Sequence, residues 1–305
     1  MKNLSTFIAG TGSYLPKKRV TNSDLEKKIN TNDEWIFSRT GIKSRYIAAE
    51  DEMTSTLALQ ASLKAIENSN ISADQVDLII LATTTPDEVF PATATVLQSQ
   101  LGLKSGIAFD IQAVCSGFVY ALTVADSMLK SGQGKRALVV GAEVFSRILD
   151  WEDRSTCVLF GDGAGAAILQ RSDNQSEILS THIHCEGKNI KNLWMEAPGT
   201  SPGSWFEENN FNSERFTPYM NGREVFRNAV KRFPEVINEA LEFNNLSIND
   251  IKLIIPHQAN YRISMAVAEK MGVNASIVYS NIHKYGNTTA ASIPIALTEA
   301  LEEGL

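Results

Sequence analysis

Short runs of apolar residues alternate along this chain with longer amphipathic segments. The clearest runs are LIILATT at 78–84, ALVVGAE at 137–143 and LIIPHQA at 253–259. Each run has the length of a strand and is apolar enough to be buried on both faces, whereas the intervening segments are long enough for helices. The pattern therefore predicts an α/β fold with buried strands.

One part of this pattern occurs twice. Residues 63–80 align with 238–255 at a constant offset of 175, and the alignment resumes at 101–110 and 271–280 with an offset of 170. Each copy reads as helix, turn and strand. The matched pairs include Ala65 with Ala240, Asn70 with Asn245, Ser72 with Ser247 and Ile79 with Ile254. Such a repeat predicts two related halves, residues 1–172 and 173–305.

The repeat also bears on the end of the sequence. A helical segment and then the strand ALVVGAE follow Cys115, whereas the helical segment that follows Asn287 runs to Gly304 and Leu305 without a further strand. We therefore expect the second half to lack its last strand, and we predict that a longer natural chain exists.

Composition and charge narrow the function classes. The 305 residues include 28 Lys and Arg against 35 Asp and Glu, a net charge of −7 with no long block of either sign, which gives no reason to expect a nucleic-acid partner. No apolar run reaches the ~18 residues of a membrane span, and the start does not resemble a signal peptide. Three cysteines without CxxC spacing indicate neither a disulfide framework nor a zinc site. We expect a cytoplasmic protein.

Three residues are candidates for chemistry. Cys115 precedes a helical segment, and a helix start favours the thiolate over the thiol, although a buried structural cysteine is the commoner case. His257 directly follows an apolar run, and alone it would as readily be structural. Asn287 in YGNTT alone would be a turn residue or helix cap. Together, Cys, His and Asn form a recurring constellation for thioester or acyl chemistry, and all three follow predicted strands, at whose carboxyl ends ligands collect.

Several motifs in the same order resemble one family, the β-ketoacyl-acyl carrier protein synthase III branch of the thiolase-fold condensing enzymes. They are DEWIFSRTGI at 33–42, FPATA at 90–94, the segment around Cys115, FGDGAGA at 160–166, PHQANYRI at 256–263 and YGNTTAASIP at 285–294. The resemblance covers nearly the whole chain. It implies a five-layered αβαβα fold of two duplicated halves, usually a homodimer, and the internal repeat agrees with that fold.

The resemblance also implies a mechanism. The Cys115 thiolate would attack an acyl-CoA, acetyl-CoA being the first choice, and hold the acyl group. Malonyl-acyl carrier protein would then lose CO2 to give an enolate, which His257 and Asn287 would stabilise as neutral hydrogen-bond donors. No cofactor is implied besides acyl-CoA as substrate. Family members also form an oxyanion hole from the backbone N–H of the cysteine and a glycine-rich loop that would lie beyond Leu305.

The remaining residues that the resemblance assigns bind substrates. Those that match CoA contacts are Thr31, Trp35, Arg39, Arg154, Gly222 and Asn260. Phe90 matches an acyl-pocket residue contributed across the dimer interface. The residues that match carrier-protein docking are Gln258, Ala259, Asn260, Tyr261 and Arg262, and Arg227, Arg262 and Lys270 could form a basic patch for an acidic carrier. Trp35 could instead be a core aromatic, and the three cations could be ordinary solvated charges.

Other interpretations stay open at this point. A polyketide-type or ester-forming acyltransferase would use the same three residues, and a non-catalytic CoA-binding homologue would retain the fold. A papain-like amidase also orders Cys, His and Asn along the chain but needs a Cys-Trp motif that is absent here. The GDGAG turn lacks the lysine of a phosphate-binding loop, so we expect close backbone packing. His182 and His184 alternate as on a strand, yet other metal ligands are not clustered around them. The Gly- and Pro-rich segment 194–220 is expected to be a loop.

Overall fold

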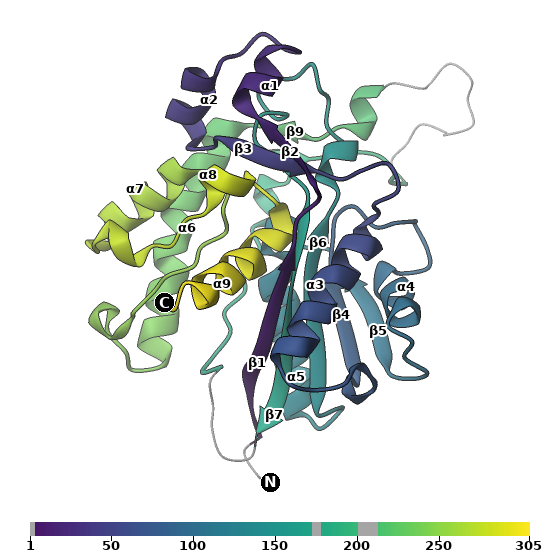
Figure 1. Ribbon diagram of the computed structural model, residues 1–305. Coiled ribbons are helices and arrows are strands. Elements are labelled where there is room, and N and C mark those ends of the chain that lie inside the picture. The colour runs from purple at the N-terminus through teal and green to yellow at the C-terminus, as the bar shows by residue number, and fades with distance from the viewer. Residues whose placement is uncertain (1–3, 173–177, 201–212) are drawn as a thin grey trace.

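A five-stranded sheet forms the centre of the computed structural model, which describes residues 4–172, 178–200 and 213–305 (Figure 1). The strands, in their order across the sheet, are β1 (Ser5–Tyr14), β7 (Gly163–Ser172), β6 (Arg136–Glu143), β4 (Leu78–Ala82) and β5 (Ile107–Ile111). β4 runs parallel to β5 and β6, and β7 runs antiparallel to β6 and β1. Strands β4, β5 and β6 therefore end at the same edge of the sheet.

Two of the apolar runs form the buried strands predicted from the sequence. Every residue of β4 is buried, as is every residue of β6 after Arg136. Alternate side chains of β4 point to opposite faces, because Ile79 belongs to the same core cluster as Leu57, whereas Ile80 belongs to the cluster of Phe118. The α/β class of the prediction is confirmed.

Helices cover both faces of this sheet. α3 contacts β1, β6 and β7 on one face, where α4 packs beside it, and α5 lies on the opposite face (Figure 1). α9 lies on the same face as α5. Gly165 and Ala167 of β7 are on one face of the sheet, and Ala167 belongs to the core cluster of α5 residues such as Phe118. A Cβ on Gly165 would lie 2.7 Å from Pro294 of α9. The helices are α1 (Asn22–Glu26), α2 (Asp33–Thr40), α3 (Thr54–Asn68), α4 (Thr93–Gln100), α5 (Gly117–Lys130), α6 (Gly222–Phe243), α7 (Tyr261–Met271), α8 (Ile282–Tyr285) and α9 (Ser292–Glu302).

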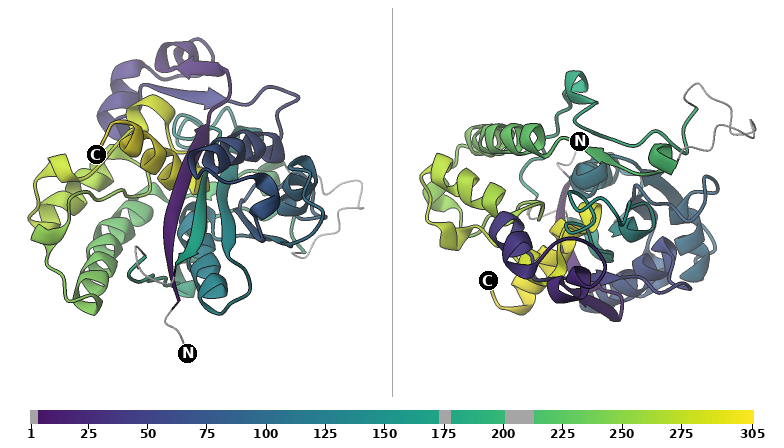
Figure 2. Two further views of the ribbon diagram at one scale, coloured as in Figure 1. Left: turned by 60° about the horizontal axis from the view of Figure 1, so that its bottom comes forward. Right: turned by 90° about the horizontal axis from the view of Figure 1, so that it is seen from above.

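Smaller elements surround this core. β2 (Lys18–Thr21) pairs with β3 (Ser44–Ile47), and β8 (Leu193–Trp194) pairs with β9 (Tyr219–Met220). The β8–β9 pair joins the ends of the segment predicted as a loop, of which residues 201–212 lie outside the described residues. α6 and α7 pack against each other at one side of the molecule (Figure 2). In the described part of the chain, no helix has the length and apolarity to cross a bilayer.

The third apolar run, 253–259, does not form the predicted strand. Within the described residues its single backbone bridge joins Ile254 to Val278, and its residues up to His257 are only half-buried. β4, by contrast, is hydrogen-bonded along its length on both sides, by β5 and β6. An apolar run becomes a regular strand only where neighbours complete its ladder.

Backbone geometry repeats between the two halves at the offsets found in the sequence. Asn70 and Asn245 both have φ of 55°, and Val114 and Thr289 have φ of 48° and 47°. The parallel pair of Ile79 with Ala108 in β4 and β5 corresponds to the bridge of Ile254 with Val278. These matches support our proposal that residues 1–172 and 173–305 are related halves.

Candidate functional site

Cys115 lies between the end of β5 and the start of α5. It sits in the short helical turn η2 (Val114–Ser116), and α5 begins two residues later at Gly117. A Cβ on Gly117 would lie 2.9 Å from Cβ of Ala82 at the end of β4, so only glycine lets α5 start this close to the sheet. The sulfur is a free thiol on a half-buried residue at the carboxyl edge of the sheet.

The charge state of Cys115 differs from the prediction that the helix start would favour a thiolate. Burial raises the pKa of the thiol to about 12, and the carboxyl group of Glu143 adds to this shift. A helix terminus contributes about 0.3–1 kcal/mol to a nearby charge. Desolvation outweighs it here, even though part of the residue reaches solvent, so Cys115 is protonated at neutral pH in the absence of substrate.

Asn287 is held by the turn that precedes β7. Its N–H donates to Leu159 O at 2.8 Å, and its carbonyl accepts from Gly161 N–H at 3.0 Å. The side-chain oxygen accepts from Thr289 N–H at 2.9 Å. The amide nitrogen makes no hydrogen bond within the described residues, which leaves the donor end of this buried side chain for a ligand.

His257 is anchored through one ring nitrogen. Its Nδ1 lies 2.6 Å from Oγ of Ser292, and that hydroxyl accepts from Gln258 N–H at 3.3 Å. This arrangement favours donation by the Ser292 hydroxyl to Nδ1, which assigns the ring proton to Nε2. Nε2 is buried and has no partner among the described residues. Burial lowers the pKa of His257 to about 4, so the ring is a neutral donor at pH 7.

The three candidate residues are brought together by residues 287–292. This segment contains Asn287, the short turn η8 (Thr289–Ala291) and Ser292, the partner of His257. η8 contacts η2, which carries Cys115. Ala290 is the central contact, since a Cβ on Gly141 of β6 would lie 2.2 Å from its carbonyl oxygen and a Cβ on Gly117 would lie 3.4 Å from its own Cβ. The GDGAG turn packs against the same region, as the sequence predicted.

Glu143 is a site residue that the sequence analysis missed. It is the last residue of β6 and is fully buried. Its carboxylate accepts from Thr84 N–H at 3.0 and 3.1 Å and from Thr85 Oγ1 at 2.7 Å. Burial raises the pKa of Glu143 to about 7. The one signal in the sequence was its position after a buried strand, the place where functional side chains collect.

The predicted CoA residues form a cluster around Trp35 of α2. The guanidinium of Arg39 lies 4.9 Å from the ring centroid and that of Arg154 lies 5.0 Å from it. Trp35 is half-buried: its side chain packs against the core cluster of Leu25 and Ile36, and part of it stays open to solvent. Thr31 is nearby in the chain, and its Oγ1 is buried without a partner in the described residues. An indole with two cations over it is suited to a planar, anionic ligand.

Two further predicted CoA residues lie next to this cluster or to a cavity. Asn260 caps α7 and donates to the carbonyl of Arg39 at 3.0 Å. Gly222 starts α6, and a Cβ there would meet only Met220 Cε at 3.9 Å. Met220 lines a cavity of about 590 Å³ between the β8–β9 pair and residues 150–155. Gly222 thus lies beside a residue of this cavity and leaves room around its own Cα.

Phe90 has the exposure expected of an interface residue. It is 82% exposed and its neighbour Val89 is 78% exposed. Two adjacent apolar side chains at this exposure are unusual for a surface that faces water alone.

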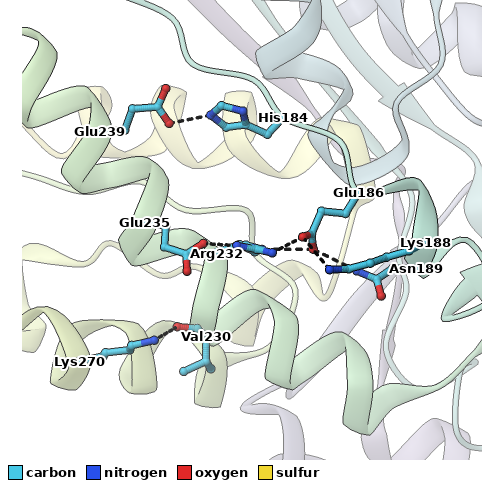
Figure 3. A network of polar contacts seen from close by, with 9 residues as sticks. All are labelled: His184, Glu186, Lys188, Asn189, Val230, Arg232, Glu235, Glu239 and Lys270. Atoms are coloured by element: carbon cyan, nitrogen blue, oxygen red, sulfur yellow. Dashed lines mark hydrogen bonds and ion pairs between the residues drawn. The ribbon is translucent and has the colours of Figure 1, made fainter.

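The residues predicted to bind a carrier protein fall into two groups. Arg227 lies on α6, and Arg262 and Lys270 lie on α7. Arg227 pairs with Glu224, and the guanidinium of Arg262 lies 5.9 Å from the Phe226 ring centroid. Lys270 donates to Val230 O at 3.4 Å (Figure 3).

The side chain of Gln258 is turned away from the surface. It is 2% exposed and bonded to Pro256 O, Tyr279 O and Asn281 N–H, so a partner protein cannot reach its side chain. Ala259 beside it is half-buried, whereas Tyr261 is 44% exposed. The Gln258 side chain instead satisfies backbone groups left unpaired by the irregular segment 253–259, so the part of this segment in carrier-protein docking stays a prediction that rests on its exposed residues.

The two histidines of the THIHCE stretch contact α6 rather than a metal. The segment is irregular, and His182 lies 3.0 Å from the carboxylate of Glu239. His184 lies 2.6 Å from the other oxygen of the same carboxylate (Figure 3). The described ranges contain no group of three or more His, Cys, Asp or Glu side chains arranged to hold a metal ion.

Comparison with known proteins agrees with the resemblance found in the sequence. Family models described as 3-oxoacyl-[acyl-carrier-protein (ACP)] synthase III and its C-terminal part match residues 109–187 and 241–305. The chain is 51% identical to the beta-ketoacyl-[acyl-carrier-protein] synthase III of Paramagnetospirillum magneticum, over 97% of this chain and 90% of that protein.

Solved structures show the same similarity. The crystal structure of 3-oxoacyl-[acyl-carrier-protein] synthase III from Aquifex aeolicus superposes with a TM-score of 0.91 at 50% identity, over 98% of this chain and 92% of the other. The priming β-ketosynthase of a polyketide biosynthetic pathway superposes with a TM-score of 0.88 at 33% identity, over 98% and 88% of the chains. The thiolase-type fold predicted from the sequence is confirmed by these neighbours.

Proposed function

Because this chain belongs to the 3-oxoacyl-[acyl-carrier-protein] synthase III family, we propose that it condenses a short acyl-CoA with malonyl-acyl carrier protein to start fatty-acid synthesis. Acetyl-CoA is the proposed starter. The observation that carries the proposal is the meeting of the segments of Cys115, His257 and Asn287 at residues 287–292. The enzyme is an acyltransferase whose reaction makes one carbon–carbon bond and releases CoA and CO2.

Cys115 is the proposed nucleophile. Its sulfur attacks the acyl carbonyl, the bond to the CoA sulfur breaks, and the proton of the thiol leaves with the released CoA. The acyl group then stays on Cys115 as a thioester. Since the thiol is protonated at rest, acylation requires that its proton be removed as the substrate binds.

His257 and Asn287 are the proposed donors for the second step. When the malonyl group loses CO2, negative charge develops on the thioester oxygen. Nε2 of His257 and the amide nitrogen of Asn287 have no competing partner among the described residues, and both groups are neutral. Each donor aimed at such an oxygen contributes about 3–4 kcal/mol of transition-state stabilisation.

Trp35, Arg39 and Arg154 are the proposed adenine site, with Thr31, Asn260 and Gly222 along the route to Cys115. The geometry that supports this is the indole ring with both guanidinium groups within 5.0 Å of its centroid. We propose further that Phe90 and Val89 are covered in a homodimer, and that Arg227, Arg262, Lys270 and Tyr261 contact the carrier protein in the cytoplasm.

Acylation with radiolabelled acetyl-CoA tests the first step. We expect label on Cys115 in the purified protein and none in Cys115→Ser. His257→Ala and Asn287→Ala should still acquire label but lose decarboxylation of malonyl-acyl carrier protein. Labelling of Cys115→Ser at the level of the unaltered protein would contradict the role of the thiol.

The similarity to a polyketide priming ketosynthase makes that reaction class the second candidate. The two are separated by offering malonyl groups on fatty-acid carrier protein, on polyketide carrier protein and on CoA. Condensation with the first at the highest kcat/KM supports the fatty-acid role. Saturable CoA binding without any acylation would instead indicate a non-catalytic homologue.

A further inference from the structure

Glu143 is a buried carboxyl group with no cation beside it in the described part of the chain. Its hydrogen-bond partners include the N–H of Thr84, the hydroxyl of Thr85 and, at 3.4 Å, the hydroxyl of Thr83. No Lys, Arg or His of the described residues forms an ion pair with it. A carboxylate in such a place is costly, and hydrogen bonds from neutral groups offset only part of the cost. The group therefore holds a proton more strongly than an exposed glutamate.

The sheet places this carboxyl group next to the nucleophile. Ala82 of β4 stands in register with Ile111 of β5 and with Gly141 of β6. Cys115 follows Ile111 by four residues, and Glu143 follows Gly141 by two. A Cβ on Gly117, two residues after Cys115, would lie 2.9 Å from Cβ of Ala82, and the turn η8 contacts both η2 and β6, so these contacts bring Cys115 and the end of β6 to the same edge of the sheet. The negative charge of Glu143 acts on the Cys115 sulfur, and it is the largest contribution to the raised thiol pKa after burial.

The other groups around Glu143 do not compete for this role. The segment after β4 and the turn η8 present the hydroxyls of Thr83, Thr85 and Thr289. On the β7 side, the acidic group is Asp162, whose oxygens are taken by Ser146 and by the N–H of Ala48. Of the two ionisable groups near Glu143 at this end of the sheet, Asp162 and Cys115, Cys115 is the one on which the charge of Glu143 acts.

We propose that Glu143 is a positioning residue that sets the ionisation of Cys115. An ionised Glu143 keeps the sulfur protonated and unreactive, and a protonated Glu143 permits the thiolate to form. The site thus resists carrying two negative charges, which protects an empty Cys115 from oxidation and alkylation. The proposal rests on the nucleophilic role given to Cys115 above, but its consequence for thiol reactivity does not require acyl-CoA.

Alkylation by iodoacetamide measures this directly, because only the thiolate reacts. The rate at Cys115 is followed by mass spectrometry of its peptide from about pH 6 to pH 10, which separates it from the exposed Cys185. Glu143→Gln has nearly the shape of the native residue and cannot ionise. We expect alkylation of Cys115 in this variant to be at least about 10-fold faster at pH 7.5, as for removal of a like charge worth one pKa unit or more. An unchanged or slower rate overturns the proposal.

A second variant serves if Glu143→Gln does not fold. Thr85→Val removes a hydroxyl that stabilises the carboxylate, so Glu143 stays protonated to higher pH and alkylation near pH 7.5 should accelerate, by less than in Glu143→Gln. Thr85→Ser keeps the hydroxyl and is the matched control, with the native rate expected. Equal rates in Thr85→Val and Thr85→Ser would overturn the proposal.

Labelling with acetyl-CoA is run in parallel. Absence of acylation in the unaltered protein would refute the proposed function, while a shifted alkylation rate would still support the coupling of Glu143 to Cys115.

Discussion

The Ser292 hydroxyl is expected to control decarboxylation through His257, and Ser292→Ala tests this. The hydroxyl lies 2.6 Å from Nδ1 of His257 and is buried at the first residue of α9. Without it, Nδ1 loses its partner and the proton of the neutral ring is no longer directed to Nε2. The enolate oxygen then meets a donor for only part of the time.

The size of the effect follows from one buried hydrogen bond. Its loss is worth about 1 kcal/mol, or about 1–3 kcal/mol where a buried group is left unpaired, as Gln258 N–H would be. If about 1–2 kcal/mol of this appears in the barrier, decarboxylation slows about 5- to 30-fold. Acylation of Cys115 should change much less, because His257 is not the acyl-transfer nucleophile.

Two measurements separate these steps. Release of labelled CO2 from malonyl-acyl carrier protein reports decarboxylation, and the burst of CoA release from acetyl-CoA reports acylation. Thr298→Val is the control variant, since it removes a buried hydroxyl of the same helix that donates to Pro294 O at 2.8 Å and not to the His257 ring. Comparable slowing of decarboxylation in both variants would show that α9 stability, and not the His257 tautomer, was changed. A native rate in Ser292→Ala would refute the reasoning outright.

Three further changes have outcomes that the structure specifies. Trp35→Ala should raise KM for acyl-CoA about 5- to 30-fold with little change in kcat, because the stacking surface and two cation–π contacts of about 0.5–1 kcal/mol each are lost. Trp35→Phe should retain part of the affinity, and an unchanged KM in Trp35→Ala would contradict the adenine site. Gly141→Ala should abolish acylation and lower the melting temperature, since its Cβ would lie 2.2 Å from Ala290 O. Gly187→Ala is the control: its Cβ would meet nothing within 4 Å, so acylation and melting temperature should stay unchanged. Glu143→Gln should raise the free energy of unfolding more at pH 8 than at pH 5. The folded carboxyl keeps its proton to about pH 7 and the unfolded one to about pH 4.5, so burial of this group costs stability as the pH rises through that window. A larger gain at pH 5 would contradict this sign.

The predictable part of this molecule is the part that depends on local pattern. β4 and β6 were evident because a strand buried on both faces needs an unbroken apolar run. The run at 253–259 has the same composition, and what it lacks is neighbours on both sides, which no local pattern records. The positions of Cys115 and His257 after such runs were enough to suggest where the site would form.

What escaped prediction depends on distance through space. Glu143 and Ser292 become site residues because β6 and α9 reach Cys115 and His257 in the folded chain. Gln258 looked like a surface residue in its motif, but it turns inward to satisfy backbone groups. The charge state of Cys115 depends on two opposing effects: the helix dipole favours the thiolate, and desolvation favours the thiol. Which effect is larger depends on how deeply the sulfur is buried, and the sequence does not record that depth.

The matching backbone strain at Val114 and Thr289 bears on the two halves that we propose. Both are β-branched residues with φ near +48°, a conformation that costs of order 1–3 kcal/mol, and each directly precedes the equivalent position of its half. In the first half that position is Cys115, and in the second it is Ala290. If the halves are related as we propose, one copy of this turn presents the proposed nucleophile, and the other presents a methyl group that packs against the start of α5 beside it. On that proposal a single reactive centre remains, and the equivalent turn of the second half supports it.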